Sequence, residues 1–397
     1  MSLVEDALSG PSVFKDAAKL SFDYVPDGLP HRDDVIRQLG TMFRGVVEGQ
    51  TSQTASLMGP VGTGKTVVAR FFARELREAM RKRGRDLKVA YVNCRNERTS
   101  AMVMTNIVRS LDRGFPDRGF SIPEMLDALR RLIEKGNSHL LVILDEIDVL
   151  FATKTDLVYN LSRFSTTGGP AVSVLAISQT DIFPKLDEAT ASTFKRTNTL
   201  ELTGYGRKAM MDIVNQRVDL AFHAGTFPED VAELVAEIAV EKKQGNARLA
   251  VELLETAGRR ADSRGEGLVK ADDVRAAKGT LYPELPESKL RELPLHEMLL
   301  LLAIARRLAR DGGAYAITGK VETSYKLACE EFGETARGHT QFWQYLKNLA
   351  SYRFIDLRTS GEGHPGTTQL ISLPDVPADE FAERLMALLA DVGKKKA

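Results

Sequence analysis

Residues 59–66, with the sequence GPVGTGKT, restrict the possible folds of this 397-residue chain more than any other feature. They follow a short β-like run, ASLMG, and they lead into a long helical pattern from Lys65 to Arg81. A glycine-rich loop that joins a strand to a helix and ends in Gly-Lys-Thr can cradle phosphates with its backbone amides at the helix N-terminus. A chance glycine-rich turn is the alternative. The loop in this context predicts a nucleotide-binding α/β domain.

Each part of the loop has an expected task. The side chain of Lys65 would reach the β- and γ-phosphates of ATP, and the hydroxyl of Thr66 would coordinate Mg²⁺. The backbone amides of the turn would surround the phosphates. The expected ATP-binding residues of this segment are Gly59, Pro60, Val61, Gly62, Thr63, Gly64, Lys65, Thr66 and Val67.

Apolar runs that alternate with helical patterns continue this organisation as far as Thr203. After ASLMG, strands are expected at 88–94, 140–146, 171–179 and 198–203, with amphipathic helices at 33–47 and twice between 94 and 140. Near-continuous apolar strands of this kind form parallel sheets that helices cover on both faces. We therefore expect an α/β P-loop NTPase domain over residues 1–203.

Polar residues end two of the expected strands. The run LLVILDE delivers Asp145 and Glu146 to the carboxyl edge of the sheet, beside the phosphate loop. Asp145 would hold Mg²⁺ through water, and Glu146 would orient or activate the attacking water. Gln179 ends the next strand, where its amide would touch the γ-phosphate or that water. An ordinary polar strand end is the alternative for Gln179.

After Thr203 the strand pattern stops, and residues 204–282 indicate an all-helical lid domain. The segment GNARLAVELLETA places Arg248 just inside a helix start, with Leu249 and Leu253 in an apolar stripe that anchors the helix. A cation at this position could fold over the phosphates and report ATP versus ADP. An exposed helix arginine is the alternative.

Residues 283–294 carry prolines and charges and indicate a linker. Beyond it, residues 295–397 show three helical patterns and a hairpin pattern, the outline of a winged helix-turn-helix. The third helix, HTQFWQYLKNLA, would enter the major groove of DNA, and the wing would grip the DNA backbone or the minor groove. A winged helix that binds a protein is the alternative, because acidic residues are about as numerous here as basic ones. The expected DNA contacts are Thr340, Gln341, Gln344, Lys347, Arg358 and His364.

Composition restricts how DNA could be bound. The chain has 54 Lys+Arg against 54 Asp+Glu, which excludes a protein that coats nucleic acid by bulk attraction. Two cysteines far apart in sequence argue against a disulfide framework or a Cys-based zinc site. No segment has the pattern of a signal peptide or a membrane span. We therefore expect a cytoplasmic, nucleoid-associated protein with no membrane partner.

The ordered set of motifs resembles the AAA+ ATPases, and more narrowly the archaeal origin-recognition and helicase-loader initiators of the Orc/Cdc-six family. The resemblance rests on DYVPDGLPHRDDVI, GPVGTGKT, YVNC, LDEIDVL, LVYNLSRF, GNARLAVELL and the C-terminal winged helix. It implies that Val25, Pro26 and Arg32 flank the adenine base. It also implies that the turn DRGFPDRGF belongs to a DNA-contacting insertion, in which Arg113 and Arg118 add a second contact.

Two positions depart from the family pattern. Ala189 occupies the usual place of an arginine finger, a residue that contributes orders of magnitude to hydrolysis. Lys195 or Arg196 lies close enough in sequence to substitute for it. Gln179 stands where the family usually has asparagine. The resemblance with these departures implies a slow, switch-like ATPase or a divergent paralogue.

Taken with the resemblance, the sequence predicts an ATP-dependent replication initiator with ATP/ADP and Mg²⁺ as cofactors. Its partners would be double-stranded origin DNA, the replicative helicase and other initiator subunits. Two other classes stay open. One is an AAA+ signalling ATPase whose winged helix docks a protein, and the other is a non-hydrolysing regulator of a true initiator.

Overall fold

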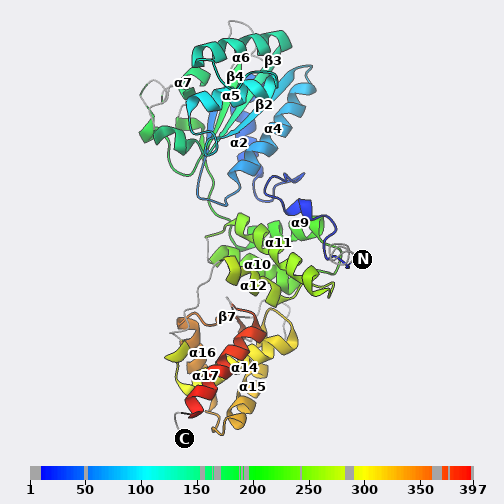
Figure 1. Ribbon diagram of the computed structural model, residues 1–397, viewed down its shortest axis with the longest axis vertical. Coiled ribbons are helices and arrows are strands. Elements are labelled where there is room, and N and C mark those ends of the chain that lie inside the picture. Colours follow the sequence, from blue (N-terminus) through cyan, green and yellow to red (C-terminus); the bar gives the residue numbers. More distant parts are fainter. Residues whose placement is uncertain are drawn as a thin grey trace. The chain divides into compact units, whose positions relative to one another are not determined.

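The computed structural model describes residues 10–48, 52–152, 157–162, 164, 171–186, 188, 191, 196–241, 244–281, 290–359, 369–373 and 376–394. The chain divides into two compact units. The α/β unit contains Asp23–Ala209 and Gln244–Arg248, and the C-terminal unit contains Met1–Phe22, Met210–Lys243 and Leu249–Ala397. Figure 1 shows the helices and strands of both units.

Five parallel strands form the centre of the α/β unit, in the order β2-β3-β4-β1-β5. Every residue of β3 and β4 is buried, which explains their unbroken apolar runs, because helices cover both faces of the sheet. The predicted parallel sheet is confirmed. Its strands are β1 (Thr54–Met58), β2 (Asp86–Asn93), β3 (Ser138–Asp145), β4 (Val172–Ser178) and β5 (Thr199–Glu201).

The register of the strands aligns the residues that end them. Asn93 at the end of β2 lies opposite Asp145 at the end of β3. Met58 at the end of β1 lies opposite Ser178 at the end of β4. The glycine-rich loop after β1, the Asp145 carboxylate and the residue after Ser178 therefore share the carboxyl edge of the sheet, as expected for a ligand site in an open α/β sheet.

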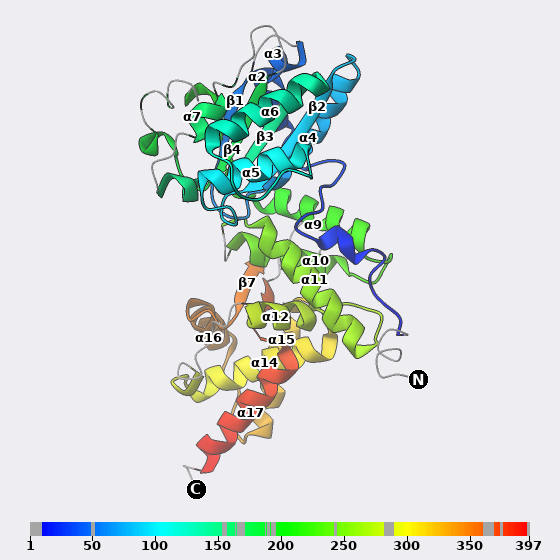
Figure 2. The ribbon, with the colours of Figure 1, turned by 45° about the horizontal axis from the view of Figure 1, so that its top comes forward.

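Helices pack on the two faces of this sheet through two apolar cores (Figure 2). The helix α6 begins at a capping box between Ser121 and Glu124, which explains its sharp start. One core holds α2 (Asp33–Met42), α3 (Arg44–Glu48) and α4 (Lys65–Arg81). The other holds α5 (Ser100–Leu111), α6 (Ile122–Gly136) and α7 (Leu157–Ser162). Short 3-10 helices are η2 (Ile147–Ala152), η3 (Phe183–Lys185) and η4 (Arg196–Asn198).

A helical region, drawn in green in Figure 1, follows the sheet domain in sequence. Residues 10–22, which include η1 (Ala17–Leu20), pack on this region, although the sequence prediction placed them in the α/β domain. The ring centroids of Phe14 and Phe222 are 4.9 Å apart, and the Val13 N–H donates to Asp262 Oδ1 at 2.6 Å. The helices are α9 (Arg207–Ala221), α10 (Glu229–Glu241), α11 (Ala247–Arg264) and α12 (Ala271–Leu281).

The remainder of the C-terminal unit is a winged helix, as predicted, with an antiparallel sheet in the order β6-β8-β7. Sequence reasoning missed β6 and α17, since a two-residue strand leaves no periodic pattern and α17 follows the hairpin where no helix was sought. Phe381 and Leu385 of α17 are buried in the core. The elements are α14 (Leu295–Asp311), β6 (Ala316–Ile317), α15 (Thr318–Glu331), α16 (His339–Ser351), β7 (Asp356–Thr359), β8 (Gln369–Ser372) and α17 (Ala378–Lys394).

A buried arginine joins the helical region to the winged helix. Arg275 of α12 is 1% exposed, and its guanidinium donates to the carbonyl oxygens of Leu373 at 3.0 Å and Ala314 at 2.7 Å. It also donates to Asp272 Oδ1 at 2.6 Å. The same Asp272 oxygen accepts the backbone N–H of Ala378, where α17 begins, at 3.0 Å. Buried hydrogen bonds therefore tie these two parts of the C-terminal unit together.

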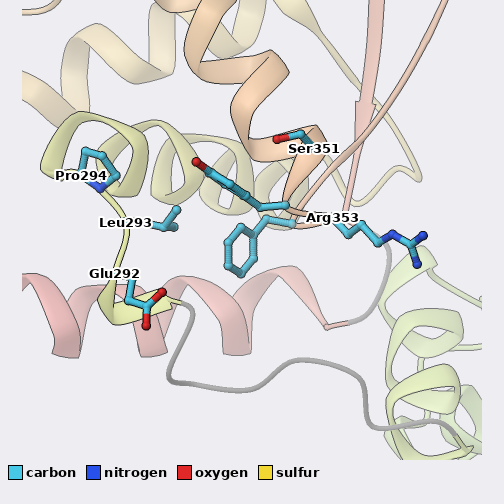
Figure 3. Close-up of a pocket in the computed structure, with 7 residues that line it drawn as sticks. Glu292, Leu293, Pro294, Ser351 and Arg353 are labelled. Atoms are coloured by element: carbon cyan, nitrogen blue, oxygen red, sulfur yellow. The ribbon is translucent and has the colours of Figure 1, made fainter.

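A hollow of about 390 Å³ lies beside the start of α14 (Figure 3). Glu292, Leu293 and Pro294 line it from one side, and residues 351–354 line it from the other. Arg353 there has a φ of 62°, in the left-handed region. In the part of the chain that the structure describes, no helix is both long and apolar enough to cross a membrane.

Candidate nucleotide-binding site and DNA-binding surface

The glycine-rich loop after β1 has a backbone conformation that requires glycine. Gly62 and Gly64 have φ values of 82° and 86°, a region that side chains disfavour. A Cβ on Gly62 would collide with the side-chain amide of Asn246, and a Cβ on Gly59 would collide with the carbonyl oxygen of Leu202. The loop is therefore a backbone cradle that its neighbours hold tightly.

Lys65, the first residue of α4, folds back over this cradle. Its ammonium donates to the carbonyl oxygens of Gly59 at 2.6 Å and Pro60 at 2.7 Å. Burial lowers the pKa of Lys65, and the nearby carboxylates of Asp145 and Asp148 oppose that shift. The positive charge is thus positioned at the loop, where this motif receives the phosphates of a nucleotide.

Asp145, the last residue of β3, is buried beside the start of α4. Its Oδ2 accepts the hydroxyl of Thr66 at 2.7 Å and the hydroxyl of Tyr91 at 2.7 Å. Its Oδ1 accepts the backbone N–H of Glu146 at 2.9 Å. A hydroxyl and a carboxylate side by side are oxygen groups that suit Mg²⁺ when phosphates supply its other ligands. With the cradle and the Lys65 ammonium, they fit a nucleotide with Mg²⁺.

Glu146 follows Asp145 in a left-handed backbone conformation, with a φ of 53°. Such a value is uncommon outside glycine, and it indicates a sharp turn at the end of β3. The Glu146 side chain is 30% exposed, and its Oε2 lies 3.2 Å from Arg95 Nη1. A partly exposed carboxylate next to the buried Asp145 meets solvent water, which the predicted role in water activation requires.

Gln179 is exposed just after β4. Its backbone N–H donates to Asp148 Oδ2 at 2.8 Å, and the hydroxyl of Thr180 donates to Asp148 Oδ1 at 2.9 Å. Lys185 Nζ lies 3.6 Å from the same Asp148 oxygen. Asp148 therefore fixes the turn that carries Gln179 at the carboxyl edge of the sheet.

Arg32 is bonded to the phosphate loop and to the segment after β5. It is only 9% exposed, and its Nη2 donates to the carbonyl oxygens of Thr63 at 2.8 Å and Thr203 at 3.0 Å. Its Nε donates to the hydroxyl of Tyr205 at 3.0 Å. These bonds show that the guanidinium supports the phosphate loop, while the predicted contact of Arg32 with the base stays a prediction.

The segment before α2 lies against α4. Arg74 Nη2 donates to the carbonyl oxygen of Pro26 at 3.1 Å, and Arg70 Nη1 donates to Asp23 Oδ1 at 2.8 Å. Pro26 is buried and Val25 is half-buried. Two arginines of α4 thus hold the predicted adenine-contacting segment on the helix that begins with Lys65, and the base contact itself stays a prediction.

Arg248 is exposed in the first turn of α11. The neighbouring Ala247 N–H donates to the carbonyl oxygen of Gly62 at 3.0 Å, so this turn touches the phosphate loop. Leu249 and Leu253 are buried, as the apolar stripe predicted. The helix therefore presents Arg248 beside the loop, while its role toward a nucleotide stays a prediction.

The candidates for an arginine finger are only partly described. Ala189 and Lys195 lie outside the described residues. The Arg196 Nη2 lies 2.7 Å from Asp181 Oδ2, and its guanidinium carbon lies 5.5 Å from the centre of the Phe183 ring. Arg196 thus has partners within its own chain.

The predicted recognition helix, α16, has one polar and one buried face. Gln344 Nε2 donates to Asn348 Oδ1 at 2.9 Å on the polar face. The buried side chains are Phe342, Leu346 and Leu349, and the exposed ones include Thr340, Gln341, Gln344 and Lys347. The four predicted contacts of this helix therefore lie together in solvent, as readout of a DNA groove requires.

Arg358 of β7 is held inside the C-terminal unit. Its Nη1 donates to Glu237 Oε1 at 2.6 Å, and its Nη2 donates to Glu233 Oε2 at 2.8 Å. Its guanidinium carbon lies 3.9 Å from the centre of the Tyr315 ring, and the Tyr315 hydroxyl bonds to Glu237. We therefore reassign Arg358 from DNA contact to joining β7 with α10. The other predicted wing residue, His364, lies outside the described residues.

The turn between α5 and α6 carries two exposed arginines, Arg113 and Arg118. The rings of Phe115 and Phe120 have centroids 4.8 Å apart, so the two ends of the turn are in contact, although Phe120 is itself exposed. A further cation, Arg109, is paired with an aspartate of the turn. The two predicted arginines are therefore on the surface of a locally packed turn.

Sequence reasoning missed Tyr91, although a signal for it was available. On β2 and β3, alternate residues face α4, and Leu87 lies in the same core as Leu141 and Ile143. The same alternation places Tyr91 on the face of Asp145. Reading the two strands together would have identified this contact.

Comparison with known proteins gives three family matches along the chain. Residues 48–186 match the model of an "AAA domain". Residues 211–279 match "Cdc6 AAA+ ATPase-type lid domain", and residues 288–384 match "CDC6, C terminal winged helix domain". The order of these matches is that of the predicted domains.

Relatives and solved structures match over nearly the whole chain. The "ORC1-type DNA replication protein 2" of Sulfurisphaera tokodaii is 32% identical over 397 aligned positions, covering 97% of this chain and 94% of that protein. The crystal structure of Cdc6p from Pyrobaculum aerophilum has a TM-score of 0.79 at 27% identity, covering 96% of this chain and 99% of the other. The Aeropyrum pernix ORC1 protein in complex with DNA has a TM-score of 0.62 at 30% identity, covering 95% and 97%.

Proposed function

We propose, since the chain belongs to the Orc/Cdc-six family of AAA+ replication initiators, that it binds double-stranded origin DNA under the control of ATP. The observation that carries the proposal is the exposed polar face of α16 in a chain that also holds the Thr66–Asp145 pair at a phosphate cradle. The protein would act in the cytoplasm at the nucleoid and help to load the replicative helicase, together with other initiator subunits.

In the nucleotide site, each residue has a separate task. The loop amides and Lys65 would bind the phosphates, and Thr66, with Asp145 through water, would hold Mg²⁺. When bound, the ion would neutralise charge at the phosphates. Glu146 accepts a proton from water, and Gln179 orients that water.

Hydrolysis would be slow and would serve as a switch. Arg196 has partners in its own chain, and Ala189 offers no cation at the usual finger position, so neither of these two positions would supply the charge with which an arginine finger accelerates phosphoryl transfer. Arg248 beside the loop would report ATP versus ADP, because a guanidinium contacts a terminal phosphate strongly.

Contact with DNA would come from two places. The exposed residues of α16 would read the major groove, with Gln341 and Gln344 at base edges and Lys347 on a phosphate. Arg113 and Arg118 would add phosphate contacts from the α5–α6 turn. The solved complex of Aeropyrum pernix ORC1 with DNA, at 30% identity, supports DNA as the partner.

The test begins with selection of bound duplexes from a random pool, followed by affinity measurements on a selected and a scrambled duplex over a salt series. Gln344→Ala is expected to reduce the preference for the selected duplex by about 1–3 kcal/mol. Lys347→Ala is expected to weaken binding to both duplexes alike and to reduce the slope of log affinity against log salt by about one. Arg384→Ala, at an exposed cation of α17 outside the proposed surface, is the matched control.

The outcomes separate the proposed function from its rival. Enrichment of one sequence, lost in the Gln344 variant and retained in the control, supports the initiator. Two results together would contradict the proposal: no sequence is enriched from the pool, and wild type and the Lys347 variant bind duplex DNA equally well. They would show that the winged helix does not read DNA, and they would favour a winged helix that docks a protein.

A further inference from the structure

We propose that Tyr91 is a positioning residue for the magnesium site, which it serves by orienting the Asp145 carboxylate. The inference rests on the proposed nucleotide site and deepens it. Tyr91 lies on β2, the strand that pairs with β3, and it is not part of the phosphate loop or of the strand that ends in Asp145.

The first step is the set of donors around Asp145. Its Oδ2 accepts both the Tyr91 and the Thr66 hydroxyls at 2.7 Å, and its Oδ1 accepts the Glu146 N–H at 2.9 Å. Donors on both oxygens fix the rotation of the carboxylate. Of the two donors on Oδ2, Thr66 is itself a predicted Mg²⁺ ligand. Tyr91 is therefore the one that remains dedicated to Asp145 when Thr66 binds the ion.

The second step is that Tyr91 is itself held in place. The Arg70 guanidinium carbon lies 4.3 Å from the centre of the Tyr91 ring, and Arg70 donates to Asp23 Oδ1 at 2.8 Å. The Tyr91 hydroxyl donates to Asp145 Oδ2 at 2.7 Å from this held ring. The hydroxyl is thus a fixed donor on a ring that α4 clamps.

The third step is the connection that this clamp makes. Asp23 belongs to the segment predicted to contact the base, and Arg70 belongs to the helix that begins with Lys65. The order Asp23, Arg70, Tyr91, Asp145 therefore links the base side of the site to its metal side through hydrogen bonds and one ring contact.

The size of the effect follows from the role. A ligand must be held within about 0.5 Å of its productive position, and groups that orient metal ligands typically change metal affinity about 10–100-fold when removed. Tyr91→Phe keeps the ring under Arg70 and removes only the hydroxyl. The substitution should weaken the binding of Mg²⁺ and leave the phosphate cradle intact.

The experiment measures the affinity of the full chain for ADP in EDTA and in saturating Mg²⁺. The ratio of the two dissociation constants is the Mg²⁺ coupling. In Tyr91→Phe we expect this ratio to fall at least about tenfold, with the affinity in EDTA within about twofold of wild type. Arg70→Met should reduce the ratio less, since it removes the clamp and keeps the hydroxyl. Tyr352→Phe, at an exposed tyrosine of the winged helix, is the matched control and should leave both constants unchanged.

Each result decides one question. If wild type does not bind ADP, or binds it with no effect of Mg²⁺, the proposed nucleotide site itself is wrong. If wild type shows coupling and Tyr91→Phe retains it, or loses affinity equally in EDTA and Mg²⁺, Tyr91 only packs and the inference is overturned. If Tyr91→Phe does not fold, Arg70→Met decides, and an unchanged ratio there also overturns the inference.

Discussion

Replacing Arg275 by methionine should selectively destabilise the C-terminal unit. Methionine keeps much of the volume and removes the guanidinium, which is 1% exposed and bonded to the carbonyl oxygens of Leu373 and Ala314 and to Asp272. The substitution leaves the two carbonyl oxygens without this donor at a buried site, and it leaves the Asp272 carboxylate, which is 24% exposed, without its guanidinium partner. The Asp272 carboxylate keeps only the backbone N–H of Ala378 among these partners.

The expected loss can be estimated from these contacts. Breaking a buried ion pair by removing one partner costs about 3–5 kcal/mol, and a buried acceptor left unpaired costs about 1–3 kcal/mol. Because these terms overlap, we expect about 3–5 kcal/mol in total. With a urea dependence of about 2 kcal/mol per molar, the unfolding midpoint should fall by about 1.5–2.5 M.

The chain provides its own probe for this measurement. Its single tryptophan, Trp343, lies on α16 and packs against the winged-helix core. Tryptophan fluorescence during urea unfolding of the full chain therefore follows the C-terminal unit and not the α/β unit. The matched control is Arg259→Met on α11, where the arginine side chain is 67% exposed and pairs with Glu255 at 2.7 Å. That exposed pair contributes at most about 0.5 kcal/mol, so the control midpoint should barely move.

The reasoning is refuted if the Arg275→Met midpoint falls by no more than the control midpoint does. Such a result would mean that other donors or water satisfy the carbonyl oxygens after the guanidinium is removed. The helical region and the winged helix would then not depend on Arg275 for their connection.

Four other outcomes follow from the site and its surroundings. Lys65→Ala should abolish ATP binding in a filter or fluorescence assay, because the cradle loses its only lysine ammonium; binding at wild-type affinity would contradict this. Glu146→Gln should retain binding and stop phosphate release, and continued turnover would remove Glu146 from the mechanism. Arg358→Ala should leave the salt slope of DNA binding unchanged while lowering the Trp343 unfolding midpoint, since the residue is held by carboxylates; a reduced slope would restore it as a DNA contact. Burial lowers the pKa of His139 to about 4. Between pH 4 and about pH 6.5 the unfolded chain therefore binds more protons than the folded chain, so the free energy of unfolding should decrease as the pH falls through this window. Unfolding measurements on the α/β unit should show a smaller decrease in His139→Gln.

The parts of the fold that could be predicted are those whose physics is local. A buried parallel strand needs an apolar run, and a phosphate loop needs glycine at left-handed positions, so β3 and residues 59–66 were visible in the sequence. The family matches and the parallel sheet confirmed these predictions. The leucine stripe beside Arg248 was visible for the same reason, because it has helical period.

The parts that could not be predicted depend on partners far apart in sequence. An arginine in a wing pattern has the same local sequence whether it meets a phosphate or two glutamates of another helix, as Arg358 does. Arg32 is similar, because only the folded chain brings Thr63 and Thr203 to its guanidinium. Local pattern identified the cations but not their partners.

This difference changes the meaning of the neutral net charge. The chain has equal numbers of basic and acidic residues, and several of its arginines, including Arg32, Arg275 and Arg358, are bonded within the protein and support its structure. The cations proposed for DNA contact are then few: Lys347 on α16 and Arg113 and Arg118 in the α5–α6 turn. With three phosphate contacts, the slope of log K against log salt would be about −3, far from the steep slopes of proteins that bind DNA by charge alone. Since α16 and the α5–α6 turn belong to different units, the proposed contacts would reach full affinity only if both units engaged the same duplex.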